Sequence, residues 1–379
     1  DQPRSRGLGD VYKRQYLWIT LPDTLTSSRT SVKHPIVGIE LSVNVDVINK
    51  GDFRFNVGAI YNYNRNKLDE LPNADQYLYS SYWGSSSLVP TNDYMFVEGK
   101  AIGLVRGFIS EGYYTVDDFN YTNGQYVLKE GVPDITKALT ATYMHPYDLP
   151  AGQTAFPGAA KFRDVDESGT VDLDDATCLG EVMPRHTGSF QLNFNYKNFD
   201  LSTNFNWTAG GKVYNVAAMI NASGQEFDGI GAQRASWVAD AFKVYNVNAA
   251  GDLYAVTNPD ELRALNANAK YHLPYHQSGI TSSEWLENGS YLRLQTLTLG
   301  YTLPKNWLTK VHVDKIRLYL TATNLFTITG YSGIDPEVNA NPTGQSGFYS
   351  DLRIFPTLNM DFGTYPRART FTFGANITF

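Results

Sequence analysis

Apolar and polar side chains alternate along several stretches of this chain. In the clearest stretch, 39–47, apolar residues fill every second position and polar residues fill the positions between them. The apolar set is Ile39, Leu41, Val43, Val45 and Val47, and the polar set is Glu40, Ser42, Asn44 and Asp46. Because successive side chains of a β-strand point to opposite faces of a sheet, this pattern predicts a strand with one apolar and one polar face.

Two turn signals join such stretches into hairpins. The sequence NKGD at 49–52 separates the first stretch from a second alternating stretch at 53–64. Lys197-Asn198 likewise separates 190–196 from 201–207, where the polar face is rich in asparagine. Short connections of this composition between alternating stretches are typical of β-hairpins. The sequence therefore predicts two hairpins.

Further alternating stretches lie near the C-terminus. We predict a third strand pair at 291–301 and 315–325, with a bulge at Gln295-Thr296, where the alternation changes phase. The last predicted strand, 371–379, ends on an aromatic residue. Its apolar face consists of Phe371, Phe373, Ala375, Ile377 and Phe379.

The lengths of the connections separate two interpretations of these strands. A soluble β-sandwich also alternates, but connections longer than about 15 residues are uncommon in compact domains. Transmembrane barrels combine tight turns at one end with long loops at the other. Short connections here are 49–52, 197–198 and 303–313, and long ones are roughly 65–187, 210–288 and 327–367. We therefore predict an all-β fold, a transmembrane antiparallel β-barrel.

The first long connection leaves one choice open. Short and long connections alternate along the chain only if 65–187 contains zero or two spanning strands, and Ala101 to Ile109 is a candidate for one. Aromatic residues at strand ends, such as Tyr61, Tyr63, Tyr196 and Tyr301, would suit an interfacial girdle, although each also suits a protein core.

Composition narrows the possible functions. No segment approaches the ~20 apolar residues of a membrane-spanning helix, whereas barrel strands need only about 9–11 alternating residues. Charged residues make up 18% of the chain and aromatic residues 14%. The formal net charge of −7 argues against a nucleic-acid partner, since nothing supplies a basic surface. The single cysteine, Cys178, excludes an internal disulfide.

The first residues are set apart from the fold. The chain starts at Asp1 without methionine, and Asp10 to Gln15 read DVYKRQ, which looks like a translated sequencing adapter. We interpret 1–15 as non-native and exclude it from the fold prediction. The missing start also means that the lack of a signal peptide says nothing about export.

One segment has the spacing of a calcium-binding loop. Asp164, Asp166, Ser168, Thr170, Asp172 and Asp175 occupy positions 1, 3, 5, 7, 9 and 12, and Gly169 occupies position 6. Serine at position 5 and aspartate rather than glutamate at position 12 depart from the usual pattern. The alternative is a solvated loop in which Asp and Gly only form Asx turns. If Ca²⁺ binds, we expect it to brace the loop that precedes the second hairpin.

Other candidates for chemistry are weaker. His272 and His276 have the spacing of a helical metal pair, but Pro274 between them argues against a helix. Asn258-Pro259 predicts a helix start, and a second short helix is expected within 233–243. Trp237, Trp285, Tyr82, Trp83 and Tyr143 could stack on sugars or pack the loops together, and packing is favoured. No nucleophile elbow or phosphate-binding loop is present, so we do not predict an enzyme.

Several short motifs follow one another from about residue 38 to the end of the chain. They are 38–41 (GIEL), 52–55 (DFRF), 63–67 (YNRNK), 98–103 (EGKAIG), 287–294 (ENGSYLRL), 299–304 (LGYTLP), 323–326 (TNLF), 335–337 (DPE) and 365–370 (YPRART). As an ordered set, these segments resemble the C-terminal half of SusC/RagA-type TonB-linked outer-membrane proteins. Ala101 stands where this family usually has proline.

The resemblance implies a function and partners. It implies import of a bulky nutrient, an oligosaccharide or a peptide, across the outer membrane of a Gram-negative, Bacteroidota-like bacterium. Residues 16–379 would be part of a plugged barrel of about 22 strands, with the plug and first strands missing. The implied partners are a SusD-like surface lipoprotein, the TonB complex through the missing N-terminal region, and outer-membrane lipid. Phe371, Phe373, Ile377 and Phe379 resemble a barrel-assembly signal.

Two other classes of protein stay open. A secreted or cell-surface β-rich glycan-binding module with a calcium loop would have the same alternation but would dissolve without detergent. A glycoside hydrolase would need two loop carboxylates at catalytic separation, which the spacing does not indicate.

Overall fold

The structure is a computed structural model of the 379-residue chain. It describes residues 15–21, 30–69, 71, 76–81, 88–140, 145–223, 235–273, 279–308, 313–338, 359–361 and 363–379. Residues 1–14 of the segment interpreted as adapter-derived, together with Tyr82, Trp83, Tyr143 and His276, lie outside the described residues.

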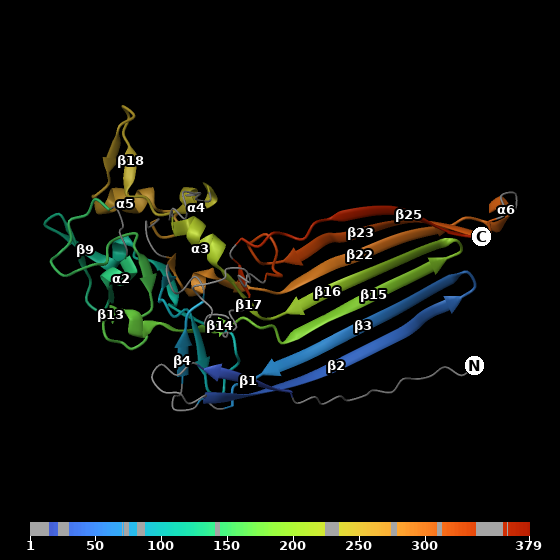
Figure 1. Ribbon diagram of the computed structural model, residues 1–379. Helices are drawn as coiled ribbons and strands as arrows, with labels where there is room; N and C mark the ends of the chain where they lie inside the picture. The colour runs from blue at the N-terminus through green and yellow to red at the C-terminus, as the bar shows by residue number, and fades with distance from the viewer. Residues whose placement is uncertain are drawn as a thin grey trace, which may run out of the picture.

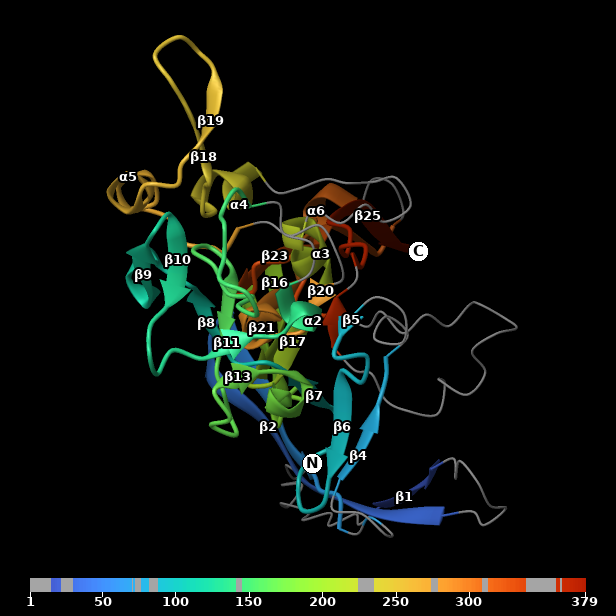
Figure 2. The same ribbon diagram turned by 90° about the vertical axis from the view of Figure 1, so that its left-hand side faces the viewer.

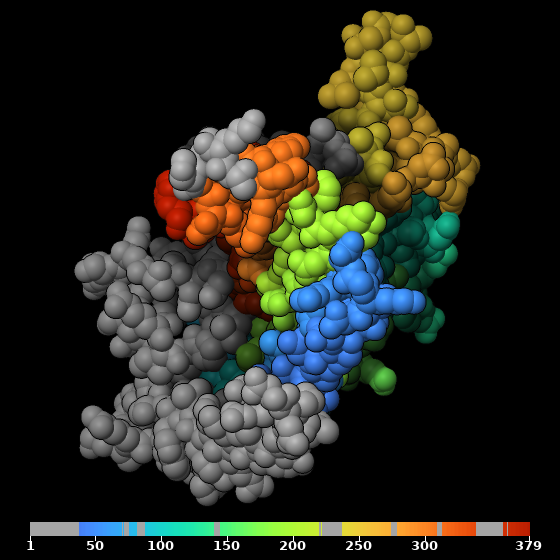
Figure 3. All heavy atoms as spheres, turned by 90° about the vertical axis from the view of Figure 1, so that its right-hand side faces the viewer, coloured from blue at the N-terminus to red at the C-terminus, as the bar shows by residue number. Residues whose placement is uncertain are grey.

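An eight-stranded antiparallel sheet with long strands dominates the molecule (Figure 1). Its strands follow one another in chain order, so neighbouring strands are joined by hairpins or by loops at one end. In order they are β1 (Gln15–Leu21), β2 (Thr30–Lys50), β3 (Phe53–Asn66), β15 (His186–Tyr196), β16 (Phe199–Ala209), β22 (Tyr291–Thr302), β23 (Lys315–Thr329) and β25 (Thr370–Thr378). Viewed from the end opposite the long loops, the sheet follows an arc (Figure 3).

The hairpins and the bulge predicted from alternation are confirmed. β2 pairs with β3 across Gly51-Asp52, and β15 pairs with β16 across Lys197-Asn198. The register between β22 and β23 shifts between Leu294 and Thr296, as the change of phase indicated. A second shift, between Asp46 and Ile48, leaves Val47 outside the β2–β3 register.

The first long connection contributes no strand to this sheet. β3 pairs directly with β15 along its whole length, from Phe53 opposite Tyr196 to Tyr63 opposite His186. The candidate spanning strand at Ala101 to Ile109 is therefore wrong. Within that range, β7 (Leu104–Gly107) pairs instead with β6 (Tyr94–Val97) and β14 (Thr177–Glu181) in a separate four-stranded sheet. Its four residues are too few to cross a bilayer.

The long connections fold together at one end of the sheet (Figures 1 and 2). We call the described residues of 67–185, 210–290 and 330–369 the loop domain. Short strands hold it together: β4 (Gln76–Tyr79), β5 (Leu88–Val89), β8 (Ser110–Tyr113), β9 (Phe119–Thr122), β10 (Gln125–Leu128), β11 (Asp134–Ile135), β12 (Ala160–Phe162), β13 (Thr170–Val171), β17 (Lys212–Asn215), β18 (Tyr245–Val247), β19 (Leu253–Ala255), β20 (Gly279–Ile280), β21 (Leu286–Asn288) and β24 (Met360–Asp361).

The helices are short, and most lie in the loop domain. Asn258 caps α5 by accepting hydrogen bonds from the backbone N–H groups of Asp260 and Glu261, as its sequence predicted. The helices are η1 (Val116–Asp118), α2 (Lys137–Thr140), η2 (Leu173–Asp175), α3 (Val216–Ser223), α4 (Ala235–Asp240), α5 (Pro259–Leu265), η3 (Ser283–Trp285) and α6 (Lys305–Leu308). Among the described residues, no helix has the length and apolar character needed to cross a membrane.

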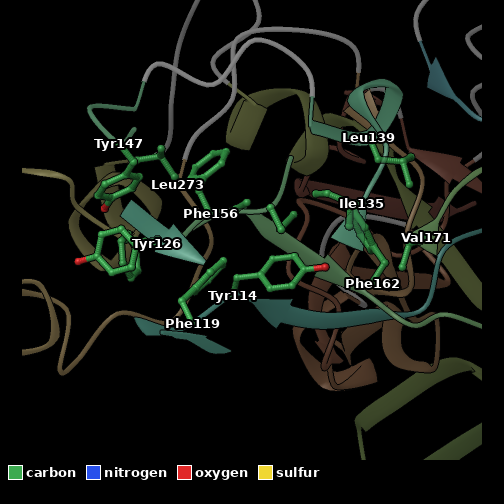
Figure 4. Close-up of a cluster of buried hydrophobic side chains, with 14 of the residues drawn as sticks. Tyr114, Phe119, Tyr126, Ile135, Leu139, Tyr147, Phe156, Phe162, Val171 and Leu273 are labelled. Atoms are coloured by element: carbon green, nitrogen blue, oxygen red, sulfur yellow. The ribbon is translucent and has the colours of Figure 1, made fainter. Parts of the chain in front are cut away.

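Two large hydrophobic cores and one small cluster of Val213, Tyr331 and Val338 stabilise the described part of the loop domain. One gathers aromatic and aliphatic side chains from β9, β10, β12 and the segment 145–160, including Tyr126, Tyr147 and Phe156 (Figure 4). The other contains Trp237 and Trp285, whose ring centroids lie 6.3 Å apart, with Tyr271 stacked on Trp237. Both tryptophans are buried, so they pack the loops together, as we favoured.

Candidate functional site

The two faces of the long sheet differ in chemistry. Alternate residues of β2, β22, β23 and β25 expose large apolar side chains to the surroundings, and Ile328 and Phe373 are 62% and 73% exposed. Cross-strand pairs such as Val45 with Val57 and Leu299 with Leu320 extend this apolar face from strand to strand. Exposed apolar surface on this scale indicates contact with a nonaqueous surrounding rather than with water.

Aromatic side chains mark both ends of the apolar face. Near the loop domain, the hydroxyl of Tyr61 lies 2.8 Å from Nδ1 of His186, and Trp207 stacks on the same tyrosine. At the other end, Phe199 packs on Tyr301 with ring centroids 4.6 Å apart. Aromatic rings with polar atoms at two levels of an apolar band fit the two interfaces of a bilayer.

The opposite face is polar and hydrogen-bonded across the strands. The side-chain amide of Asn56 donates to Asn44 at 2.8 Å and to Asp46 at 2.9 Å. Asn193 donates to Asn56, and Ser202 donates to Asn193 at 2.6 Å. This chain of contacts crosses four neighbouring strands, so the polar residues of the alternation form one continuous surface.

Nearer the end opposite the loop domain, an ion pair spans three strands of the same face. Arg317 on β23 donates from Nε and a terminal nitrogen to the carboxylate of Asp200 on β16. Gly300 on the intervening strand makes room for the pair, because a Cβ there would overlap both side chains.

At the loop-domain end of the polar face, a buried arginine gathers two acidic residues. Arg293 is 2% exposed and donates to Asp335 at 2.5 Å, while its other terminal nitrogen lies 3.2 Å from Glu337. Arg367 also pairs with Glu337, at 2.5 Å. These four residues come from three of the motif segments that resemble the SusC/RagA family. Sequence reasoning noted the segments but missed that they meet.

The predicted calcium loop brings three of its six candidate ligands together. One carboxylate oxygen each of Asp164, Asp166 and Asp175 lies within 4.8 Å of the others. Gly169 has a φ of +87° and donates from its N–H to Asp164, as a sharp turn at position 6 requires. Hydrogen bonds from Ser168 lower the pKa of Asp166. The arrangement can therefore hold a hard cation through carboxylate oxygens.

The other three candidate ligands make different contacts. Asp172 caps η2 by accepting from the backbone N–H of Asp174 at 2.8 Å, and it is not part of the carboxylate cluster. The hydroxyl of Ser168 donates to the carbonyl oxygen of Thr170 at 3.0 Å. Several of these hydrogen bonds are those of Asx turns, so the loop also has the features of the alternative interpretation.

The remaining sequence candidates lie apart from one another. Phe371, Phe373, Ile377 and Phe379 are exposed, and the first three continue the apolar face on β25 at one edge of the sheet. His272 is buried beside Trp237, and burial lowers the pKa of its imidazole to about 4.

A curved antiparallel sheet with one exposed apolar face and one polar face is part of a transmembrane β-barrel. Comparison with known proteins narrows this class further. The chain is 29% identical over 343 residues to TonB-dependent receptor P3 of Formosa agariphila, covering 90% of this chain and 28% of that protein. It is 24% identical over 351 residues to TonB-dependent receptor SusC of Bacteroides thetaiotaomicron, covering 90% of this chain and 26% of that receptor.

Solved structures give the same fold. The RagAB peptide importer in its 'closed-closed' state matches with a TM-score of 0.61 and 19% identity, over 96% of this chain and 32% of that one. No family model matches. The resemblance to SusC/RagA-type TonB-dependent receptors indicated by the sequence motifs is thus confirmed over most of the chain. The chain spans about three tenths of the length of the proteins that it matches.

Proposed function

We propose that this chain is part of a TonB-dependent importer in the outer membrane of a Gram-negative, Bacteroidota-like bacterium. The proposal depends on one observation, the two-faced transmembrane sheet with a folded loop domain at one end, in a chain similar over 90% of its length to TonB-dependent receptors. The cargo would be a bulky nutrient, an oligosaccharide or a peptide. The chain is similar to TonB-dependent receptors and has the fold of a peptide importer, which supports transport rather than catalysis.

The partners follow from the same proposal. The polar face would line the lumen of a plugged barrel of about 22 strands, to which residues 16–379 contribute. A SusD-like lipoprotein would cover the loop domain from outside the cell. The TonB complex would act through a plug and an N-terminal region encoded upstream of Tyr16, and outer-membrane lipid would surround the apolar face.

Gene deletion and growth would test the import proposal. The complete gene, with its native sequence upstream of Tyr16, would be deleted and then restored, and growth would be measured on single oligosaccharides and peptides. We expect loss of growth on one class, restored by the complete gene but not by a version lacking the TonB-interacting segment. Unchanged growth on all of them, with the protein extracted by buffer without detergent, would instead favour a soluble glycan-binding module.

We also propose that the loop at 164–175 binds Ca²⁺ in a structural role. The support is the meeting of Asp164, Asp166 and Asp175 around the turn at Gly169. Calorimetric titration of the chain in detergent with Ca²⁺ should give a binding signal that Asp164→Asn abolishes. Glu167→Gln is the matched control, since it removes the same charge from an exposed residue outside the cluster. Equal binding by both variants would contradict the proposal.

We propose, third, that Phe371, Phe373, Ile377 and Phe379 signal barrel assembly. Their support is the exposed alternating strand β25 at the edge of the sheet. Phe379→Ala in the complete receptor should lower the amount of folded, outer-membrane protein measured by heat-modifiable migration in gels. Thr372→Ala, on the polar face of the same strand, should leave that amount unchanged.

A further inference from the structure

Two lysines stand at the end of the apolar face that lies away from the loop domain. Lys50 is the last residue of β2, and Lys197 begins the turn between β15 and β16. The two hairpin turns are neighbours at this end of the sheet (Figure 1), because the backbone N–H of Lys197 donates to the carbonyl oxygen of Asp52 at 3.1 Å. Both lysines are exposed. They therefore form a pair of positive charges where the apolar face ends.

A row of four aromatic rings borders the two lysines. Each ring lies opposite its neighbour on the next strand, so all four side chains share the apolar face. The row consists of Phe53, Tyr196, Phe199 and Tyr301. Lys50 lies opposite Phe53 in the same register, and the ammonium group of Lys197 lies over the ring of Tyr196, 5.4 Å from its centroid. Tyr196 and Phe199 are 52% and 53% exposed, so the row is open to the surroundings.

Neither lysine has an anionic partner in the part of the chain that the structure describes. Asp52 is the only acidic residue of the two turns, and it forms no ion pair with Lys50 or Lys197. On the polar face of the same end, by contrast, Arg317 is paired with Asp200. The two ammonium groups beside the aromatic row are thus available to an anion from outside the chain.

The backbone conformation at Lys197 is unusual for a lysine. Its φ is +51°, in the left-handed region where two-residue hairpin turns favour asparagine, aspartate or glycine. The Cβ of any other residue makes this region unfavourable. Turn geometry alone would therefore select a different residue, whereas lysine at this position places an ammonium group level with the aromatic row.

We propose that the two lysines and the aromatic row bind the phosphate group of an anionic phospholipid in the periplasmic leaflet of the outer membrane. The ammonium groups would contact the phosphodiester, and the rings of Tyr196 and Phe199 would contact the glycerol and the first methylenes of the acyl chains. A zwitterionic phospholipid carries an ammonium group of its own, which the lysines repel, so the site favours a lipid with net negative charge. The choice of leaflet rests on the proposed import function, which puts the loop domain outside the cell.

Lipid binding by the complete receptor would test the proposal. The receptor in non-ionic detergent would be titrated with dioleoylphosphatidylglycerol, with dioleoylphosphatidylethanolamine and with soluble glycerophosphoglycerol, and the bound molecules counted by native mass spectrometry. Lys50→Gln combined with Lys197→Asn removes both charges, and asparagine suits the φ of residue 197, so the turn is kept. Arg54→Gln is the control, because Arg54 is an exposed cation next to the same turn, opposite Asn49 and Asn195 on the polar face. Heat-modifiable migration in gels would show that each variant is folded.

The outcomes separate this proposal from its alternatives. We expect phosphatidylglycerol to bind in preference to phosphatidylethanolamine, with about fivefold weaker binding for each lysine removed and no change in Arg54→Gln. Equal binding of the two lipids, or an equal loss in the control, would overturn the proposal. Binding of glycerophosphoglycerol as tight as that of the lipid would also overturn it, because the aromatic row would then contribute nothing.

Failure of the lipid site and failure of import are distinguishable. If growth on a nutrient depends on the gene while the receptor binds both lipids equally, import stands and the lipid site is refuted. If deletion of the gene leaves growth unchanged on every nutrient while the receptor prefers phosphatidylglycerol through Lys50 and Lys197, the lipid site stands and import is refuted.

Discussion

Replacement of Arg293 should release the segment that the buried ion pairs hold against the polar face. In Arg293→Met the carboxylate of Asp335, which is only 10% exposed, loses the cation 2.5 Å away. Removing one partner of a buried pair costs about 3–5 kcal/mol, because the other charge stays buried without compensation. Glu337 adds little to this figure, since it is 38% exposed and keeps Arg367 at 2.5 Å.

Hydrogen exchange measures this loss directly. At 1.36 kcal/mol per factor of ten, amides of 331–338 should exchange on the order of 100-fold faster or more in the variant, where exchange reports local opening. The double variant Arg293→Met with Asp335→Asn removes both charges and keeps an acceptor for the backbone N–H of Glu337, which lies 2.9 Å from Asp335. It should recover most of the protection.

Two results would refute the reasoning about Arg293. If the single variant exchanges like the unmodified chain, the pair contributes nothing and the segment is held by packing of Tyr331 and Val338, both of which are buried. If the double variant exchanges as fast as the single one, the cost comes from the lost volume of the arginine side chain rather than from a stranded charge.

Three further predictions concern the loop domain. Gly158→Ala should destabilise the core drawn in Figure 4 by about 1–3 kcal/mol, because Gly158 has a φ of +95° and a Cβ there would overlap the ring of Phe242. Denaturant unfolding measures this loss. Gly152→Ala is the control, since Gly152 has a φ of +91° but open space around it. Asn258→Ala should cost about 1 kcal/mol by removing the cap of α5, and Asn258→Asp should restore most of it. Burial raises the pKa of Asp93 to about 6, so the folded state holds the proton of this carboxyl group more tightly than the unfolded state does. The free energy of unfolding should therefore fall as pH rises from about 4 to 6. Asp93→Asn should flatten that part of a pH–stability profile.

Alternation predicted the long strands well because it depends only on neighbouring residues. Each strand needs an apolar face for lipid and a polar face for the lumen. The two faces appear in the sequence as alternating apolar and polar residues, which can be recognised without knowing which strand pairs with which. The hairpins at Gly51-Asp52 and Lys197-Asn198 could be predicted for the same reason, because each joins two strands that are adjacent in the chain. The phase change at Gln295 indicated the bulge, since an extra residue reverses the faces on either side of it.

The loop domain could not be predicted in the same way. Its strands are two to five residues long, too short for a period to be recognised, and its cores join segments far apart in the chain. The segment 101–109 illustrates the error that follows. It has enough apolar residues for a spanning strand, yet Ile102 and Val105 are buried in the loop domain. A protein core and a lipid bilayer both favour apolar side chains, so the sequence alone does not distinguish the two environments.

Contacts on the polar face lay beyond the sequence for a further reason. The alternation along each strand assigns Asp200, Gly300 and Arg317 to one face of the sheet. It does not reveal that the strand register places Gly300 between Asp200 and Arg317, which are 117 residues apart in the chain. Gly58 obeys the same alternation, yet its neighbours leave a hollow rather than an ion pair. Which polar groups meet is decided by the register of strands that long loops separate, and the register cannot be read from the alternation within any one strand.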